Sequence, residues 1–302
     1  MSPAPEAARA ESIPRAALWM TGSIASFSLM AVGGRELGAA LSTFDIMAHR
    51  SLIGLAVVTA AALALGRTAE LRPRAMRLHL ARNSAHFAGQ NLWFWALTAI
   101  PLAQVFAIEF TSPLWVALAA PLLLGERLTL GRVAAAAAGF LGVIIVTRPF
   151  GGGLDLGQAA AALAAICFAA TAIATKRLTR TQSTLSILFW LTATQSVMGL
   201  AVTLPTGLDL PPPALLHWTV VVSLAGLSAH LCLTAALSLA PASVVAPFDF
   251  VRLPVIAVVG ALAYGESLDP WVFGGAALII GANLINVARE TRSVGRTDST
   301  AR

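Results

Sequence analysis

Long apolar segments separated by short polar stretches occupy almost the whole of this 302-residue chain. A helix that crosses the hydrocarbon core of a bilayer needs about 20 mainly apolar residues. By that measure the pattern predicts an all-α integral membrane protein with ten membrane-spanning helices around a central cavity. The predicted spans are 16–34, 44–65, 83–100, 102–124, 131–147, 157–175, 185–204, 215–239, 242–264 and 271–288.

Two prolines divide neighbouring spans. Pro101 separates the third span from the fourth, and Pro241 separates the eighth from the ninth. Because proline ends or kinks a helix, a tight hairpin is expected at both positions. The third span is the least hydrophobic, since its stretch NSAHFAGQNLWFW mixes polar side chains with aromatic ones.

The composition indicates that lipid is the solvent of the chain. Hydrophobic residues make up 57% of the sequence and charged residues only 11%, whereas a soluble domain usually has about 25% charged residues. The net charge of +6 does not indicate a nucleic-acid partner, because the basic residues lie in short loops between apolar segments. Residues 1–15 are small, polar and charge-balanced, and they are predicted to form a disordered cytoplasmic lead-in.

Arginine and lysine predict the orientation of the spans. With the N-terminus in the cytoplasm, basic residues concentrate in the segments expected on the inner side, including a basic tail at 290–302. The exceptions are Arg35 and Arg148 in expected outer loops and Arg50 and Arg252 within spans. By the positive-inside rule this distribution predicts a multi-pass protein of the inner membrane with both termini cytoplasmic.

The sequence repeats itself at an offset of 140 residues, the separation of Glu109 and Asp249. The segment ALTAIPLAQVFAIEF (96–110) aligns with ALSLAPASVVAPFDF (236–250). Further on, the turn GERL aligns with the turn GESL. The glutamates of these turns, Glu126 and Glu266, are expected to serve helix ends and salt bridges and not transport chemistry.

Each predicted repeat, at 16–148 and at 155–289, contains five spans, which is an odd number. The second repeat is therefore expected to enter the membrane from the opposite side. Inverted repeats are characteristic of secondary transporters, in which two related bundles expose one site alternately to each side of the membrane. Duplication retained only for packing is the alternative.

The chain resembles the EamA-type transporters of the drug/metabolite transporter superfamily. The resemblance rests on two five-helix halves, each with a proline-containing span, a Gly-Glu-x-Leu turn and a last helix rich in small residues. It covers nearly the whole chain, and the turn motif is specific for the family but not for a substrate. It implies an inner-membrane carrier with a central cavity, whose relatives import or export small organic solutes such as amino acids, purines, S-adenosylmethionine, riboflavin and metallophores.

Four charged residues within spans are candidates for substrate binding. An ionised carboxylate at the centre of a membrane helix costs on the order of 3 kcal/mol, and such residues normally face a water-filled cavity or a polar partner. Glu109 and Asp249 could bind a cationic or hydrogen-bonding part of the substrate, or take up a coupling proton. The alternative for Asp249 is an ion pair with Arg252, one helical turn on, which could also meet a substrate anion. Arg50 could meet a substrate carboxylate, reach the outer headgroups or form a structural pair within the protein.

Polar and aromatic side chains within spans are candidates for the lining of the same cavity. Gln90 aligns with His230 in the repeat. His86, Gln90 and Trp93 share one face of the third span, while Asn91 points roughly 100° away from Gln90. Hydrogen bonding between helices is the alternative role for the polar members of this set.

The sequence lacks the motifs of an ATPase, a serine hydrolase or a zinc protease. No GxxxxGK[ST], GxSxG or HExxH occurs, and the histidines show no metal-ligand spacing. No enzymatic activity, no cofactor and no metal are therefore expected. The last helix of each repeat, rich in small residues, serves either packing between the halves or homodimerisation.

These features together predict a secondary transporter that moves a small organic metabolite by alternating access. Aromatic residues near the aligned acids favour a planar heteroaromatic substrate, with riboflavin and S-adenosylmethionine as examples within the family. Export of amino acids or amines is the alternative within the transporter class. A membrane scaffold without transport is the alternative from another class.

Overall fold

The computed structural model describes the backbone of residues 6–124, 130–148, 155–239 and 248–299. Within these residues the chain forms helices connected by short loops and contains no strand. The chain divides into two compact units. Unit 1 comprises residues 1–29, 102–152 and 225–302, and unit 2 comprises residues 30–101 and 153–224. Both units contain segments of both sequence repeats, so neither unit corresponds to a single repeat.

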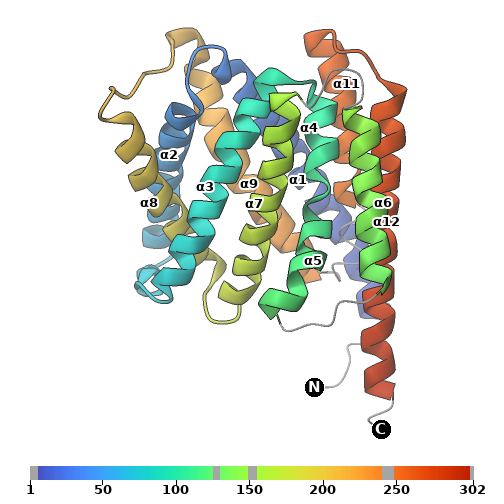
Figure 1. Cartoon of the computed structure of the whole chain (residues 1–302). Helices are drawn as coiled ribbons and strands as arrows, with labels where there is room; N and C mark the ends of the chain where they lie inside the picture. Colours follow the sequence, from blue (N-terminus) through green and yellow to red (C-terminus); the bar gives the residue numbers. More distant parts are fainter. Residues whose placement is uncertain (1–5, 125–129, 149–154, 240–247, 300–302) are drawn as a thin grey trace. The chain divides into compact units, whose positions relative to one another are not determined.

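Unit 2 is formed mainly by α2 (Thr43–Ala64), α3 (Met76–Ala99), α7 (Leu156–Leu178) and α8 (Thr184–Thr203). Within this unit α3 packs against α7 and α2 packs against α8 (Figure 1). The 3₁₀ helices η1 (Thr68–Leu71) and η3 (Pro213–Leu215) lie in its loops. The helices α1 (Glu6–Gly38) and α9 (Leu216–Leu239) contribute residues to both units.

Polar side chains determine where the helices of unit 2 begin. The Ser42 hydroxyl accepts a hydrogen bond from the backbone N–H of Asp45 at the start of α2, and Asp155 accepts one from the N–H of Gly157 at the start of α7. These caps satisfy N–H groups that the first turn of a helix leaves unpaired.

In the η1 loop, hydrogen bonds from Arg67 and, to a smaller extent, Ser183 lower the pKa of Glu70.

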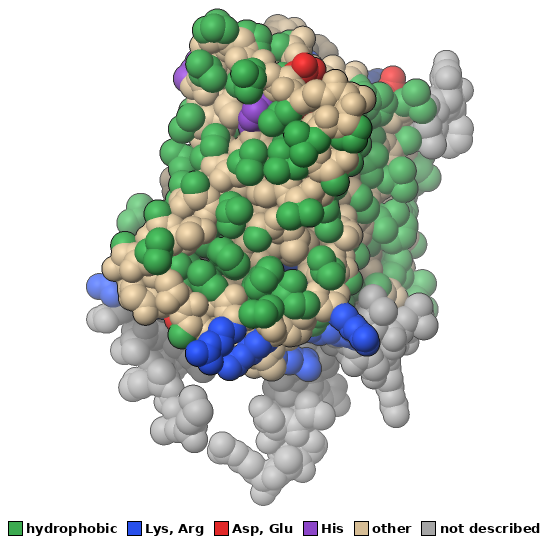
Figure 2. All heavy atoms as spheres, turned by 90° about the vertical axis from the view of Figure 1, so that its left-hand side faces the viewer, with side chains coloured by type: hydrophobic (Ala, Val, Ile, Leu, Met, Phe, Trp, Pro, Cys, Tyr) green, Lys and Arg blue, Asp and Glu red, His purple; other side chains and the backbone are tan. Residues whose placement is uncertain are grey.

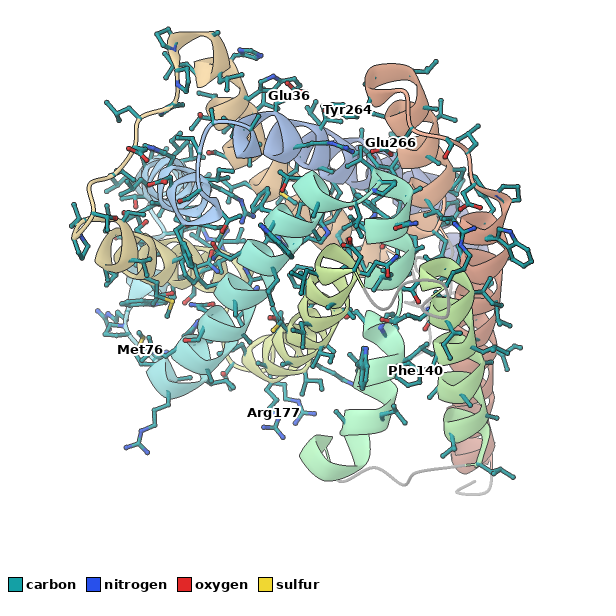
Figure 3. The ribbon with its side chains drawn as sticks, turned by 45° about the horizontal axis from the view of Figure 1, so that its top comes forward. Glu36, Met76, Phe140, Arg177, Tyr264 and Glu266 are labelled. Carbon is teal, nitrogen blue, oxygen red and sulfur yellow. The ribbon has the colours of Figure 1, made fainter. Side chains whose placement is uncertain are left out.

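Unit 1 contains α4 (Leu102–Glu109), α5 (Ser112–Leu124), α6 (Leu130–Thr147), α11 (Arg252–Tyr264) and α12 (Pro270–Ser299). Within this unit α6 packs along α12, and α4 packs against α11 (Figure 1). The rings of Trp115 on α5 and Phe140 on α6 meet edge to face, with centroids 4.7 Å apart. Figure 3 shows Phe140 on the side of α6 that faces α5.

The predicted fourth span is not one continuous helix. α4 ends at Glu109, residues Phe110 and Thr111 form a turn, and α5 begins at Ser112. The physical cause is Pro113, which lacks the backbone N–H that the Glu109 carbonyl would need in a continuous helix. The interruption therefore lies directly after the acidic residue that the sequence analysis singled out.

The ninth span is interrupted at the equivalent place. Residues 248–249 are helical, Phe250 and Val251 form a turn, and α11 begins at Arg252. Here Pro254 withholds a backbone N–H from the Phe250 carbonyl. The two turns are separated by the offset of the sequence repeat, so both aligned spans break beside their aligned acids.

The helices α6 and α12 meet through glycines. A Cβ atom on Gly142 would lie 2.7 Å from the carbonyl oxygen of Gly275, and one on Gly275 would lie 2.6 Å from the carbonyl oxygen of Gly142. Small residues allow membrane helices to approach this closely. The glycines thus pack the last helices of the two repeats against each other within one chain, and homodimerisation stays a prediction.

Most helices coincide with predicted spans, but their ends differ. α1 begins at Glu6, inside the segment predicted to be disordered, because EAARAE consists largely of strong helix formers. α12 continues to Ser299 through most of the predicted basic tail. Pro101 lies between α3 and α4, as the predicted hairpin requires. Pro241 and the GERL turn lie outside the described residues.

Five helical segments of the described chain are long and apolar enough to cross a membrane, namely Pro14–Gly38, Thr43–Ala64, Leu156–Leu178, Thr184–Thr203 and Pro213–Leu233. Shorter apolar helices lie at Leu102–Val116, Val133–Thr147, Arg252–Tyr264 and Pro270–Ile285. The described structure therefore agrees with an all-helical membrane protein. The arrangement of ten spans in two inverted repeats stays a prediction.

Basic side chains gather at one end of the face shown in Figure 2, and hydrophobic side chains cover much of the surface above them. The exposed basic residues in the loops of unit 2 and in the adjoining ends of α3 and α7 are Arg67, Arg72, Arg74, Arg77, Lys176, Arg177 and Arg180. This is the distribution that the positive-inside rule associates with a cytoplasmic end.

Substitution of Gly275 by alanine is expected to destabilise the protein. The added Cβ would meet the Gly142 carbonyl at 2.6 Å and the side chain of Val146 at 2.6 Å, so α6 and α12 would have to separate. Overpacking of this kind costs about 1–3 kcal/mol. Thermal unfolding of the purified protein in detergent measures the effect.

Gly274 is the matched control, because no atom lies within 4 Å of a Cβ added there. Gly274→Ala should leave the melting temperature unchanged or raise it, since alanine favours a helix over glycine by about 1 kcal/mol. Equal melting temperatures for the two variants would contradict the glycine contact.

Candidate functional site

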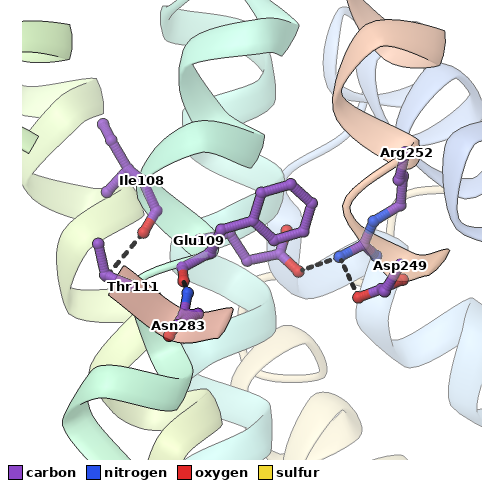
Figure 4. Close-up of polar contacts among 7 residues, drawn as sticks. Ile108, Glu109, Thr111, Asp249, Arg252 and Asn283 are labelled. Carbon is purple, nitrogen blue, oxygen red and sulfur yellow. Dashed lines mark hydrogen bonds and ion pairs between the residues drawn. The ribbon is translucent and has the colours of Figure 1, made fainter. Parts of the chain in front are cut away.

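An arginine lies between the two aligned acids in unit 1. Arg252 Nη2 is 3.1 Å from Glu109 Oε1 and 3.3 Å from Asp249 Oδ2 (Figure 4). The side chain of Arg252 is 4% exposed, and those of Glu109 and Asp249 are 16% and 30% exposed. Glu109 ends α4 and Arg252 begins α11, so the two helix interruptions bring this charge cluster together.

Three phenylalanine rings surround the Arg252 guanidinium. Its central carbon lies 4.7 Å from the ring centroid of Phe27, 4.9 Å from that of Phe106 and 5.2 Å from that of Phe110. A guanidinium at such distances is attracted to the negative face of a ring. The rings also exclude water, and a lower local dielectric strengthens the attraction between the arginine and the acids.

The charge cluster contains two acids and one arginine. The carboxylates of Glu109 and Asp249 both pair with the Arg252 guanidinium. Asp249 Oδ1 and Arg252 Nε are enclosed and have no hydrogen-bond partner within the described part of the chain. The ion pairs therefore leave part of the hydrogen-bonding capacity of Asp249 and Arg252 unused by the described residues.

Side chains hold the turn between α4 and α5 in place. Asn283 Nδ2 on α12 donates to the Phe110 carbonyl at 2.8 Å, and Thr111 Oγ1 donates to the Ile108 carbonyl at 2.7 Å (Figure 4). Backbone carbonyls freed by a helix break inside a membrane must find such donors, because lipid offers none. Asn283 is buried and fixes the position of the residue that follows Glu109.

His230 lies next to the same cluster. Its ring meets Phe27 edge to face with centroids 5.7 Å apart. Phe27 thus contacts both the imidazole and the Arg252 guanidinium. A hydrogen bond between the hydroxyls of Ser26 and Ser228 at 3.1 Å, and one from Ser23 to the Ala229 carbonyl at 3.4 Å, join α1 to α9 beside it.

The other predicted site residues lie in unit 2, on α2 and α3. Arg50 Nη1 donates to Gln90 Oε1 at 3.1 Å. His86 Nδ1 and Gln195 Nε2 of α8 are 2.9 Å apart. Arg50, His86 and Gln90 are all buried. Arg50 therefore does not reach outward to headgroups; it is directed to a neighbouring helix.

Trp93 and Asn91 contact residues of their own helix, and Asn91 Oδ1 is buried without a partner among the described residues. Trp93 is 2% exposed and packs edge to face against Phe94, with centroids 5.4 Å apart. Asn91 Nδ2 donates to the Phe87 carbonyl of its own helix at 2.8 Å. The sequence analysis grouped Trp93 with His86 and Gln90 on one face, and burial of that face accounts for the tryptophan.

The sequence analysis missed Phe27, Asn283 and Gln195. Asn283 and Gln195 are amides within predicted apolar spans, and that polarity could have marked them. Phe27 left no such signal, because a phenylalanine in an apolar span is ordinary. Among the described residues no group of three or more His, Cys, Asp or Glu is arranged to hold a metal ion.

The GESL turn supports the site from the end of α11. Gly265 has a φ of +64° and ends α11 in the left-handed conformation that glycine adopts without strain. The turn brings Glu266 Oε2 to 2.9 Å from the backbone N–H of Leu102, the first residue of α4. Figure 3 shows Glu266 at this end of α11. Glu266 has the helix-end role that the sequence predicts for it.

Replacement of Arg252 by leucine is expected to destabilise the protein strongly. The change leaves Glu109 and Asp249 without their counter-charge, and breaking a buried ion pair in this way costs about 3–5 kcal/mol. Thermal unfolding in detergent measures the loss. The variant that also carries Glu109→Gln and Asp249→Asn removes the charges together and should recover much of the stability. A melting temperature of Arg252→Leu equal to that of the parent would contradict the proposed energetics.

Known proteins with similar sequences are membrane transporters. The chain is 33% identical over 214 residues to a riboflavin transporter of Rhizobium johnstonii, covering 71% of each chain. It is 32% identical to a riboflavin transporter of Brucella anthropi, covering 80% of this chain and 86% of the relative. It is 25% identical to an S-adenosylmethionine uptake transporter of Rickettsia prowazekii, covering 91% of this chain and 93% of the relative.

The fold has a counterpart among solved structures. A crystal structure with 21% sequence identity superposes with a TM-score of 0.64 and covers 92% of this chain and 98% of its own. The family model described as the EamA-like transporter family matches twice, at residues 14–148 and 155–288. These two matches include nearly every residue of the predicted spans. The chain is a multi-pass membrane protein that belongs to the EamA-like transporter family.

Proposed function

We propose that this chain is a secondary transporter that moves a small, planar heteroaromatic metabolite across the inner membrane by alternating access. Membership of the EamA-like family supports the transporter class. The names of the relatives support the substrate class, because riboflavin and S-adenosylmethionine both contain planar nitrogen heterocycles.

The observation that carries the proposal is the pair of interrupted helices at equivalent positions of the two repeats. Broken helices in corresponding places of two halves mark the substrate site of many secondary transporters, because helix ends and freed backbone groups can contact a solute inside the membrane. In this chain the breaks carry Glu109 and Asp249, with Arg252 between them.

The charge cluster is proposed to bind the substrate and to couple its movement to protons. Phe106, Phe110 and Phe27 offer ring faces on which a planar or cationic solute can stack. The carboxylates of Glu109 and Asp249 are proposed to attract a proton or a cationic group of the solute. Exchange of a bound proton for the cationic group of the solute would link solute flux to the pH gradient.

The proposed orientation has both termini in the cytoplasm. It is supported by the exposed basic residues that gather at one end of the face in Figure 2. Insertion of the two repeats in opposite senses follows from the odd number of spans predicted for each. Labelling of single cysteines introduced at Arg74 and at Asp269 with an impermeant maleimide tests this part of the proposal, since the two positions should react from opposite sides.

The expected result for Glu109→Gln is loss of transport without loss of the fold. Removal of one charged hydrogen-bond partner should slow flux about tenfold or more. Purified protein is reconstituted into proteoliposomes, and uptake of riboflavin, S-adenosylmethionine and a mixture of amino acids is followed with and without a pH gradient. Gel filtration and thermal unfolding verify that the variant is folded.

Glu70→Gln is the matched control, because Glu70 pairs with Arg67 in a loop outside the spans and should not affect flux. Transport of amino acids alone would support the alternative substrate class. If no solute crossed in the parent protein, or if Glu109→Gln transported as well as Glu70→Gln, the proposed function would be wrong.

A further inference from the structure

Unit 2 contains a buried positive charge that the protein does not neutralise. Arg50 in α2 is 8% exposed. Its protein partners are Gln90 Oε1 at 3.1 Å and the sulfur of Met47 at 3.7 Å. Within the described chain no carboxylate lies within 4.0 Å of it. Arg252 in unit 1, by contrast, has two carboxylates.

The surroundings of Arg50 offer donors in excess of acceptors. Its Nε and Nη2 atoms, and Nε2 of Gln90, are donors for which the described residues supply no acceptor. None of these atoms is fully enclosed, whereas Nε of Arg252 is. A ligand can therefore reach them, and it must bring the acceptors itself, since guanidinium and amide N–H groups only donate.

A purely structural role does not explain the charge. Contact between α2 and α3 through Gln90 would be made equally well by a neutral donor, without the large cost of an unpaired ion in a membrane. Arg82, the other buried arginine of unit 2, likewise has no carboxylate partner among the described residues, but more of its nitrogens have protein acceptors. Its Nε donates to Thr175 at 3.0 Å and its Nη1 donates to Asn83 at 3.0 Å.

We propose that Arg50 and Gln90 form a subsite for a planar acceptor group of the transported solute. This inference rests on the proposed function, because the subsite would recognise one chemical group of the transported substrate. The guanidinium is a planar fork whose parallel N–H groups match two acceptor oxygens or an oxygen beside a ring nitrogen. The group is therefore a carboxylate or the carbonyl-bearing edge of a heterocycle, and Gln90 holds the fork in a fixed orientation.

Two pairs of solutes distinguish a carboxylate from the carbonyl-bearing edge of a heterocycle as the group that binds. Riboflavin has a carbonyl-bearing edge on a tricyclic heterocycle, and phenazine is a tricyclic heterocycle without carbonyls. Nicotinate has a carboxylate, and nicotinamide has the same ring without the charge. Dissociation constants for the purified full-length protein are measured by fluorescence quenching for riboflavin and by thermal stabilisation for the others.

The parent protein is expected to bind riboflavin more tightly than phenazine, or nicotinate more tightly than nicotinamide. A preference in the first pair indicates a carbonyl-bearing heterocycle edge, and a preference in the second indicates a carboxylate. Arg50→Gln should weaken binding of the preferred solute by about ten- to a hundredfold, the effect of losing hydrogen bonds from a charged donor. Arg50→Lys, which keeps the charge but loses the fork, should recover only part of it. Binding of phenazine or nicotinamide should change less than about twofold in all variants.

Arg82→Gln is the matched control, because it removes another buried positive charge of unit 2, one whose Nε and Nη1 both have protein acceptors. The Arg82→Gln variant should retain the parent's preference between the paired solutes. If this variant does not fold, Arg74→Gln in an exposed loop serves as the control. The inference fails, with the proposed function intact, if riboflavin crosses proteoliposomes and Arg50→Gln keeps the parent's preference. Both fail if the parent binds and transports none of these solutes.

Discussion

One ion cluster in an apolar environment organises unit 1. The Arg252 guanidinium holds Glu109 from one helix break and Asp249 from the other, and three phenylalanine rings close around it. The arginine compensates part of the cost of burying the two carboxylates, since a charge taken out of water needs an opposite charge beside it. The cluster thus explains how the chain tolerates acids within its aligned spans.

The helix breaks and the ion cluster depend on each other. Pro113 and Pro254 end hydrogen bonding at the places where Glu109 and Arg252 must turn toward one another. The breaks would in turn expose backbone groups if Asn283 did not donate to the Phe110 carbonyl. Each feature alone would destabilise a membrane protein, and together they form a polar centre in which Arg252 and Asn283 donate to the acids and to the broken backbone.

The sequence predicts the helices well because the bilayer dictates the length of an apolar run. The repeat likewise predicts that Glu109 and Asp249 occupy equivalent places. It does not predict that they share Arg252, since Asp249 is near it in sequence whereas Glu109 is 143 residues away. Only the contact of α4 with α11 brings that acid to the arginine.

Other parts of the candidate site could not be predicted for reasons of geometry. A proline in an apolar run either ends or kinks a helix, so the sequence does not say that the fourth span breaks after Glu109. Arg50 could have served a substrate, the headgroups or structural pairing, and only the structure shows that its side chain is directed toward Gln90. Phe27 joins His230 to Arg252 through ring contacts that leave no pattern in the sequence.

The two repeats are related but not equal at their breaks. Pro113 aligns with Leu253, and Pro254 aligns with Leu114, so the prolines differ by one position in register. Asn283, which holds the first turn, aligns with Val143. In a carrier whose halves exchange conformations, the inward-open and outward-open states would therefore not be mirror images of equal energy. In such a carrier, one of the two open states would have the lower energy even without a solute or a gradient, because the two helix breaks differ in their backbone.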